Sequence, residues 1–285
     1  MFRRKNSNHE QGEDDHAKKV SELKTSLGPL SERNLQYCTD ACLKRYLVAR
    51  RFNVGKAKKM LEETLKWRSS FKPEEIRWHE VAMEGETGKL FRANFHDRHG
   101  RTVLILRPGK QNTTSIDNQM RHLVYLIENA ILNLPEGQEQ MAWLIDFTGW
   151  SITNNVPLKT ARDSINILQN HYPERLAVAF LYSPPQIFEA FWKIAKFFMD
   201  PITSQKVKFV YPKNKDSMEV MKTYFDVDNL PTEFGGKATL GYDHEEFSRQ
   251  MALDDLKTAK LWGIDKVHTV PSILSGAEVA SPAEA

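Results

Sequence analysis

One acidic and one basic residue stand at the starts of two strand-like runs in the second half of the chain. Glu174 precedes the apolar run at 176–182, and Lys206 precedes the run at 207–210. The starts of two parallel strands can lie at the same edge of a sheet, so the two side chains can meet there. A carboxylate accepts hydrogen bonds from hydroxyl groups, and an ammonium group neutralises a phosphate. The pair therefore suits a ligand that carries both groups, although either residue alone could equally be a solvent-exposed charge.

The segment between these two residues is apolar on nearly all sides of a helix. Two adjacent stripes run along residues 187–199, interrupted by Glu189, Lys193 and Lys196. The stripes consist of Ile187, Phe191, Ile194 and Phe198 and of Phe188, Trp192, Ala195 and Met199. Such a helix must be buried on most sides or face lipid, so it is either an ordinary core helix or a lid over an apolar cavity.

The surrounding pattern predicts the elements that position this segment. Two strand-like runs between Leu90 and Leu106 are joined by the polar segment 97–100, which is typical of a β-hairpin. Helical and strand-like patterns then alternate. They cover 120–131 (helix), Met141–Phe147 (strand), Leu158–Leu168 (helix), Leu176–Tyr182 (strand) and Val207–Val210 (strand). This succession predicts an α/β fold with a mostly parallel β-sheet and flanking helices.

The residues before this region form a separate pattern. Apolar side chains repeat at helical spacing over 43–68, and Asn53 and Gly55 interrupt the run, which predicts a helical hairpin. Basic residues crowd the same segment, and a solvated helix face is the simplest explanation. A surface that faces an anionic membrane or a phosphate is the alternative. These residues are Lys44, Arg45, Arg50, Arg51, Lys56, Lys58 and Lys59.

The usual signatures of enzymes and metal proteins are missing from the sequence. It contains no GxSxG, GxxxxGK[ST], HExxH or GxGxxG motif. Residues 146–149 read DxxG, but without a phosphate-binding loop they indicate a strand end that turns at Gly149. Cys38 and Cys42 lack the second ligand pair of a zinc site. We therefore expect no catalytic residues, no cofactor and no metal.

Composition limits the class of protein. The chain has 285 residues, 40% of them hydrophobic, and a formal net charge of +3, which argues against binding of nucleic acid. No apolar run approaches the roughly 18–20 residues of a membrane span. Phe2 stands where myristoylation needs glycine, and no prenylation cysteine ends the chain. We expect a cytoplasmic protein that associates with membranes peripherally and transiently.

Several motifs resemble those of the CRAL-TRIO family, in particular its phosphatidylinositol transfer proteins. They appear in the family's order and together cover about residues 40–240. They are LKRYLVARRFNVGKAKKMLEETLKWR at 43–68, YPER at 172–175, SPP at 183–185, MDPITSQKV at 199–207 and LPTEFGGK at 230–237. The resemblance implies a CRAL-TRIO sheet whose flanking helices form a lipid cavity, preceded by a small all-α module.

The resulting division of the chain combines composition with the resemblance. The polar first segment and the last segment have too few large apolar residues to order themselves. The predicted parts are a flexible N-terminal arm (1–30), the helical CRAL-TRIO N-terminal module (31–75), the lipid-binding domain (76–240), a C-terminal helix (241–262) and a disordered tail (263–285).

The resemblance also implies roles for individual residues. Glu174 matches the acid that contacts inositol, Lys206 the base that contacts its phosphate, and Thr203 a hydroxyl donor to that phosphate. Arg50 matches a basic position that can reach the same head group, or it is a plain surface arginine. The expected lid helix carries Phe188, Phe191, Trp192, Phe197 and Phe198. These matches imply a protein that exchanges phosphatidylinositol between membranes. They also imply a monomer that contacts the anionic membrane surface transiently.

A departure from the family pattern concerns a second ligand. Relatives that carry phosphatidylcholine present small hydroxyl residues to the choline phosphate from the strand that corresponds to 141–147. Met141 and Trp143 occupy those positions here. Neither side chain replaces a small hydroxyl, so we expect weak phosphatidylcholine transfer and a second apolar ligand such as a sterol. The alternative function is a carrier of a sterol, tocopherol or retinoid without recognition of phosphoinositides.

Overall fold

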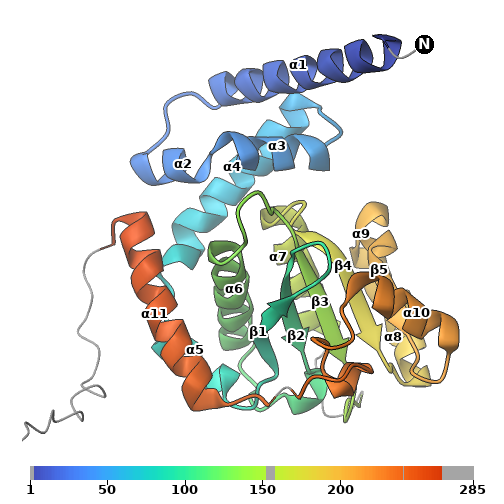
Figure 1. Ribbon diagram of the computed structural model, residues 1–285. Helices are drawn as coiled ribbons and strands as arrows, with labels where there is room; N and C mark the ends of the chain where they lie inside the picture. Colours follow the sequence, from blue (N-terminus) through green and yellow to red (C-terminus); the bar gives the residue numbers. More distant parts are fainter. Residues whose placement is uncertain (1–2, 152–157, 240, 265–285) are drawn as a thin grey trace, which may run out of the picture.

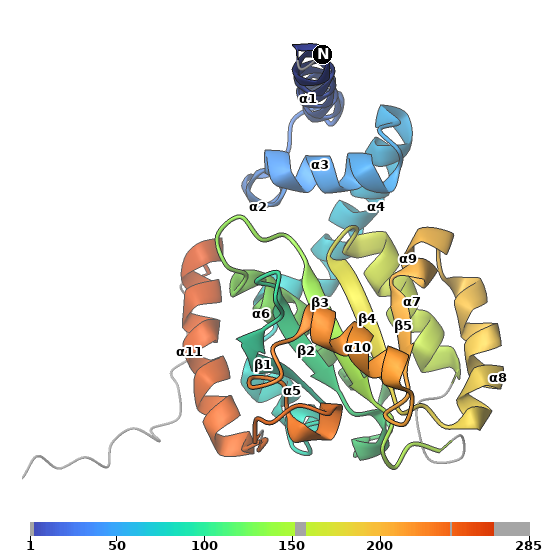
Figure 2. The ribbon, with the colours of Figure 1, turned by 45° about the vertical axis from the view of Figure 1, so that its right-hand side comes forward.

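The computed structural model describes residues 3–151, 158–239 and 241–264. A small group of helices formed by the first part of the chain lies at one end of a β-sheet domain (Figure 1). In both views the C-terminal helix α11 and helix α8 lie on opposite flanks of this domain (Figures 1 and 2). The sheet and the helices between these flanks form the main hydrophobic core.

Five strands form one sheet in the order β1-β2-β3-β4-β5. β1 pairs with β2 in antiparallel fashion, and the other neighbours are parallel, which confirms the predicted mostly parallel α/β sheet. The continuous apolar runs of β3 and β4 are typical of strands covered on both faces. The bounds are β1 (Leu90–His96), β2 (Thr102–Leu106), β3 (Met141–Asp146), β4 (Leu176–Tyr182) and β5 (Val207–Val210).

Helices cover both faces of the sheet. On one face, side chains of β3 and β4 meet α6, α7 and α8. On the other face, the Phe180 ring packs against Tyr224 and Phe225, with ring centroids 5.1 and 5.5 Å apart. The helices of this domain are α5 (Trp78–Gly85), α6 (Ile116–Leu132), α7 (Leu158–His171), α8 (Gln186–Ala195), α9 (Pro201–Gln205), α10 (Lys215–Tyr224) and α11 (His244–Trp262). Short 3₁₀ segments are η1 (Pro73–Glu75), η2 (Pro108–Lys110), η3 (Lys196–Phe198) and η4 (Thr232–Phe234).

The N-terminal module has its own core and includes the segment that we expected to be a flexible arm. It consists of α1 (Arg3–Ser26), α2 (Glu32–Tyr37), α3 (Asp40–Ala49) and α4 (Val54–Phe71). The expectation of a flexible arm over 1–30 does not hold for residues 20–27, because Leu23 of α1 is fully buried in the module's core. Val20 and Leu27 pack against the same core. With Leu23 they form an apolar stripe at helical spacing, which the polar average composition conceals.

A turn with unusual backbone geometry joins α3 and α4. Arg51 and Phe52 both adopt positive φ (50° and 56°), and Asn53 caps α4 by accepting from the Lys56 N–H at 2.9 Å. Cys38 follows α2 and Cys42 lies in α3, so the two thiols are not on one helix. Both are free and buried, and burial raises the pKa of the Cys38 thiol to about 12.

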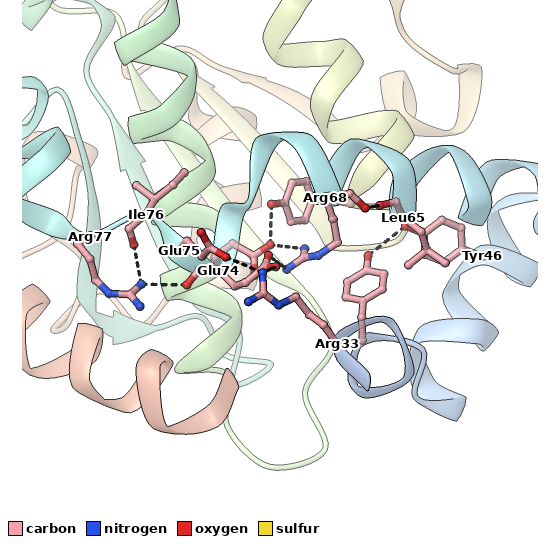
Figure 3. Close-up of polar contacts among 12 residues, drawn as sticks. Arg33, Tyr46, Leu65, Arg68, Glu74, Glu75, Ile76 and Arg77 are labelled. Atoms are coloured by element: carbon pink, nitrogen blue, oxygen red, sulfur yellow. Dashed lines mark hydrogen bonds and ion pairs between the residues drawn. The ribbon is translucent and has the colours of Figure 1, made fainter. Parts of the chain in front are cut away.

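A buried ionic cluster joins the module to the sheet domain (Figure 3). Arg68 of α4 donates to the Glu128 carboxylate of α6 at 2.6 Å and to the Glu74 carboxylate of η1 at 3.0 Å. Arg33 of α2 reaches the Glu74 carboxylate from the module side at 3.3 Å. Glu74 and Arg68 are almost completely buried, and such charges persist only when they are paired. The cluster is therefore one of the contacts that hold the module against the sheet domain, together with the stacking of Trp67 on His171.

Candidate functional site

A cavity of about 620 Å³ lies between the sheet and helices α6, α7 and α8. Alternate residues of β3 and β4 form its floor, because successive side chains of a strand point to opposite faces. α8 contributes aromatic side chains from the other side. The apolar lining includes Trp143, Ile145, Ala179, Leu181, Phe188, Phe191 and Trp192. The volume falls within the range of about 300–1,000 Å³ that is common for small-ligand sites.

The cavity wall contains the acid and the base that the sequence singled out. Lys206 Nζ lies 3.2 Å from Glu174 Oε2, and the two side chains are 20% and 27% exposed. Lys206 ends α9 immediately before β5, and its carbonyl accepts from the Ala179 N–H of β4 at 3.0 Å. The strand starts therefore bring both side chains to one edge of the sheet, as their positions predict. Their roles toward a ligand stay predictions.

Glu174 has a constrained backbone. Its φ of 58° places it in the left-handed region, which a non-glycine residue rarely adopts without support from its surroundings. Two hydrogen bonds supply that support: the Arg175 N–H donates to the Tyr172 carbonyl at 3.3 Å, and Gln140 Nε2 donates to the Glu174 carbonyl at 3.3 Å. The backbone thus holds Glu174 in an uncommon conformation at the cavity wall.

Thr203 and Arg50 line the same cavity from two further segments. Thr203 belongs to α9, which begins where Asp200 caps the Ile202 N–H at 2.8 Å. Arg50 ends α3, and its Nη1 donates to the Ala49 carbonyl at 3.0 Å. Within the described parts of the chain, Arg50 makes no ion pair. The four predicted head-group residues thus share one cavity, and the helical module supplies part of its wall.

The predicted lid helix is shorter and less buried than expected. α8 ends at Ala195 and continues as the 3₁₀ segment η3, whereas the pattern predicted a helix over 187–199. Phe188 is buried, and Phe191, Trp192 and Phe198 line the cavity at intermediate exposure.

The outer side of this segment is apolar and exposed. Phe197 is 82% exposed and does not line the cavity, while Ile187 and Ile194 are exposed on α8. Lys193 and Lys196 are exposed beside them. Of the two alternatives that the pattern allowed, burial on most sides does not hold, because Ile187, Ile194 and Phe197 are exposed. A helix that faces lipid stays a prediction.

Met141 and Trp143 occupy the cavity floor as expected for the strand residues. Trp143 Nε1 makes no hydrogen bond within the described residues, and the same holds for His122 Nε2 of α6 and Thr160 Oγ1 of α7. The sequence interpretation missed His122 and Thr160. The sequence marks these two residues only weakly. Each is a polar residue within a largely apolar helical stripe, and many polar residues in such positions form hydrogen bonds to their neighbours.

The segment Asp146–Gly149 is a turn. Asp146 Oδ1 accepts from the Thr148 N–H at 3.0 Å and from its hydroxyl at 2.7 Å, and Gly149 has a φ of 74°. The described residues contain no group of three or more histidine, cysteine, aspartate or glutamate side chains placed for a metal ion. No helix in the described part of the chain combines the length and apolarity that a bilayer crossing requires.

Comparison with known proteins identifies two matching domains. The CRAL/TRIO domain matches residues 85–236, and the CRAL/TRIO N-terminal domain matches residues 17–63. The phosphatidylinositol transfer protein PDR17 of Saccharomyces cerevisiae is 32% identical, over 80% of this chain and 67% of the relative. The CRAL-TRIO domain-containing protein C23B6.04c of Schizosaccharomyces pombe is 34% identical, over 87% of this chain.

Two further matches extend this comparison. The SEC14 cytosolic factor of Yarrowia lipolytica is 32% identical over 78% of this chain. The chain spans only 24% of the length of the Schizosaccharomyces pombe relative and 48% of the Yarrowia relative. The crystal structure of Sfh5 superimposes with a TM-score of 0.59 at 19% identity, covering 83% of this chain and 84% of that one, so the two share the fold.

Proposed function

The chain belongs to the CRAL-TRIO family, and from this premise we propose that it binds phosphatidylinositol and exchanges it between membranes. The observation that carries the proposal is the Glu174–Lys206 pair in the wall of an otherwise apolar cavity. Relatives at about 30% identity that are phosphatidylinositol transfer proteins support the same ligand. The proposed activity is binding and release, with no covalent step and no cofactor.

The cavity addresses the main barrier to lipid exchange. Removing acyl chains from a bilayer costs about 0.8 kcal/mol per CH₂, so roughly 30 methylenes amount to about 24 kcal/mol. An apolar cavity offsets most of that cost. Polar contacts cannot match this total, but they differ between head groups and therefore determine which lipid is preferred.

The head group would use the four charged or hydroxyl residues at the cavity wall. The Lys206 ammonium pairs with the inositol phosphate, and Thr203 donates a hydrogen bond to it. Arg50 supplies a second positive charge from the helical module. A phosphate that takes over the contact with Lys206 leaves the Glu174 carboxylate to accept hydrogen bonds from the inositol hydroxyls.

The outward face of α8 and η3 would contact the membrane. Ile187, Ile194 and Phe197 provide exposed apolar side chains, and Lys193 and Lys196 provide positive charge for anionic lipids. Opening of α8 would then connect the cavity to the bilayer. We propose a cytoplasmic monomer that associates with membranes peripherally and transiently.

Transfer assays with labelled phosphatidylinositol test this function. Lys206→Ala and Glu174→Ala should each lower the transfer rate at least about tenfold, because removing one partner of a desolvated charge contact costs about 2–5 kcal/mol. Lys208→Ala is the matched control, since Lys208 lies two residues away on β5, is exposed and does not line the cavity. Equal transfer by the Lys206 and Lys208 variants, with unchanged circular dichroism, would remove the pair from the site.

A second ligand is proposed from the Met141 and Trp143 positions. They offer no small hydroxyl to a choline phosphate, so phosphatidylcholine transfer should be weak, and an apolar lipid such as a sterol should exchange instead. A carrier of a sterol, tocopherol or retinoid that ignores phosphoinositides is the rival function. Native mass spectrometry of the purified protein separates the two, because the bound masses differ.

A further inference from the structure

Three buried polar atoms in the cavity wall lack hydrogen-bond partners among the described residues. They are His122 Nε2, Trp143 Nε1 and Thr160 Oγ1, in residues that are 1%, 7% and 4% exposed. All three residues line the same cavity, and they come from α6, β3 and α7. A fourth unpaired atom of the described residues, Trp78 Nε1, belongs to a residue that does not line this cavity. Most buried polar atoms in proteins are paired, so the gathering of the other three around one cavity favours a ligand with polar groups.

The neighbouring side chains are already paired. The Ser164 hydroxyl of α7 donates to the Thr160 carbonyl at 2.8 Å and lies 3.7 Å from Met120 Sδ of α6. Lys89, which also lines the cavity, contacts the Glu84 carboxylate and lies 3.3 Å from the Thr113 hydroxyl. The unpaired atoms therefore do not reflect a general shortage of partners in this wall.

The unpaired groups are all uncharged. The indole N–H of Trp143 only donates, whereas the Thr160 hydroxyl both donates and accepts. Burial lowers the pKa of His122 to about 3, so its imidazole is neutral near pH 7 and can accept or donate at Nε2 according to its tautomer. A phosphate beside these three groups would find no positive charge among them. An uncharged hydroxyl group, in contrast, can form a hydrogen bond with each of them.

We propose that His122, Trp143 and Thr160 form an uncharged polar subsite that recognises the hydroxyl group of a neutral second lipid. The proposal rests on the lipid-binding function proposed above and specifies the chemistry of the second ligand. A hydroxyl oxygen accepts from the indole N–H and donates to a hydroxyl or imidazole. A pure hydrocarbon of the same shape leaves these atoms unpaired, and buried unpaired groups are the basis of strong discrimination.

The test compares ligands that differ only in the oxygen. The purified full chain is titrated with cholesterol and with 5-cholestene, and separately with a 1,2-diacylglycerol and its 3-deoxy analogue. The hydroxyl-bearing member of one pair should bind about 3- to 10-fold more tightly, the effect of one net hydrogen bond. The pair that shows this preference identifies the lipid as a sterol or a diglyceride.

Variants assign the preference to the subsite. Thr160→Val keeps the shape of the side chain and removes its hydroxyl, and Trp143→Phe keeps an aromatic ring and removes the indole N–H. Each variant should therefore bring the affinities for the two members of a pair closer to equal. Ser164→Ala is the matched control, because its hydroxyl is already paired, and it should keep the preference. Thermal unfolding checks that each variant is folded.

Two results would overturn the subsite. The first is equal affinity of the unmodified protein for both members of each pair. The second is an unchanged preference in folded Thr160→Val and Trp143→Phe. Phosphatidylinositol transfer is measured separately, so its absence together with a hydroxyl preference would reject the proposed function and retain the subsite.

Discussion

Replacing Arg68 by methionine tests how the helical module is attached. The guanidinium group is buried between Glu74 and Glu128, and it also lies over the rings of Tyr37 and Trp262 at 4.4 and 5.4 Å. Methionine has a similar length and no charge, so it preserves much of the packing. The substitution leaves two carboxylates facing an apolar side chain.

The expected loss follows from the burial of these charges. Removing one partner of a buried ion pair destabilises a protein by about 3–5 kcal/mol, because the remaining charge is uncompensated. Glu74 is almost completely buried, and among the described residues Arg33, at 3.3 Å, is the one remaining ion-pair partner of its carboxylate. A loss of 1 kcal/mol lowers the melting temperature of a large domain by roughly 2–4 °C. We therefore expect Tm to fall by roughly 6–20 °C.

Urea and thermal unfolding measure the effect, and two comparisons establish its cause. Adding Glu74→Gln and Glu128→Gln to Arg68→Met should recover much of the stability, because no buried charge is then left unpaired. Lys222→Ala breaks an exposed pair with Glu219 and should cost less than about 1 kcal/mol. The reasoning is refuted if Arg68→Met costs no more than Lys222→Ala, or if the triple variant is no more stable than the single one.

Three further predictions address the lid, the pH dependence and the backbone. Trp192 fluorescence and quencher access should change when anionic vesicles are added, since α8 is proposed to open toward lipid; unchanged signals during normal transfer would contradict this. Burial, with repulsion from Arg68, lowers the pKa of His171 from 6.5 to about 4. Between these two pH values the imidazole is therefore protonated in the unfolded state and neutral in the folded state. The free energy of unfolding should therefore fall as the pH drops from 6.5 toward 4, and His171→Gln should reduce this slope in urea titrations. Gly236→Ala places a Cβ 1.9 Å from the Leu230 carbonyl oxygen and should destabilise the protein by at least about 1–3 kcal/mol in the same assay; a neutral result would mean that this turn yields easily.

Local patterns were sufficient to predict most of the sheet domain. Buried parallel strands need continuous apolar runs, which β3 and β4 provide, and the polar connection before β2 marks the hairpin. Glu174 and Lys206 could be placed at one edge because strand starts in a parallel sheet lie together. Their distance from each other, the positive φ of Glu174 and the share of the wall that Arg50 provides depend on packing between distant segments.

The misses have identifiable physical causes. α1 was overlooked because Val20, Leu23 and Leu27 are a small apolar minority in a polar segment, and only their spacing matters for burial. Periodicity could not decide between burial of α8 and a face toward lipid, since it shows which side chains share a face but not which face is covered. The lack of hydrogen-bond partners at His122 Nε2 and Thr160 Oγ1 could not be predicted either, because neighbouring elements determine which partners a buried polar atom has.

The contacts across the module boundary affect how this protein can be divided. A fragment cut at the limits of the matched CRAL/TRIO domain, residues 85–236, would lack Arg50 from the cavity wall and Arg68 as the partner of Glu128. It would also lack α11, whose Asp254 accepts from Arg92 at 2.9 Å. We therefore expect residues 85–236 alone to be less stable than the whole chain and to lack part of the cavity wall. A shortened or fused form of the protein should keep the proposed lipid binding only when it includes α2 to α4 and α11 together with the sheet.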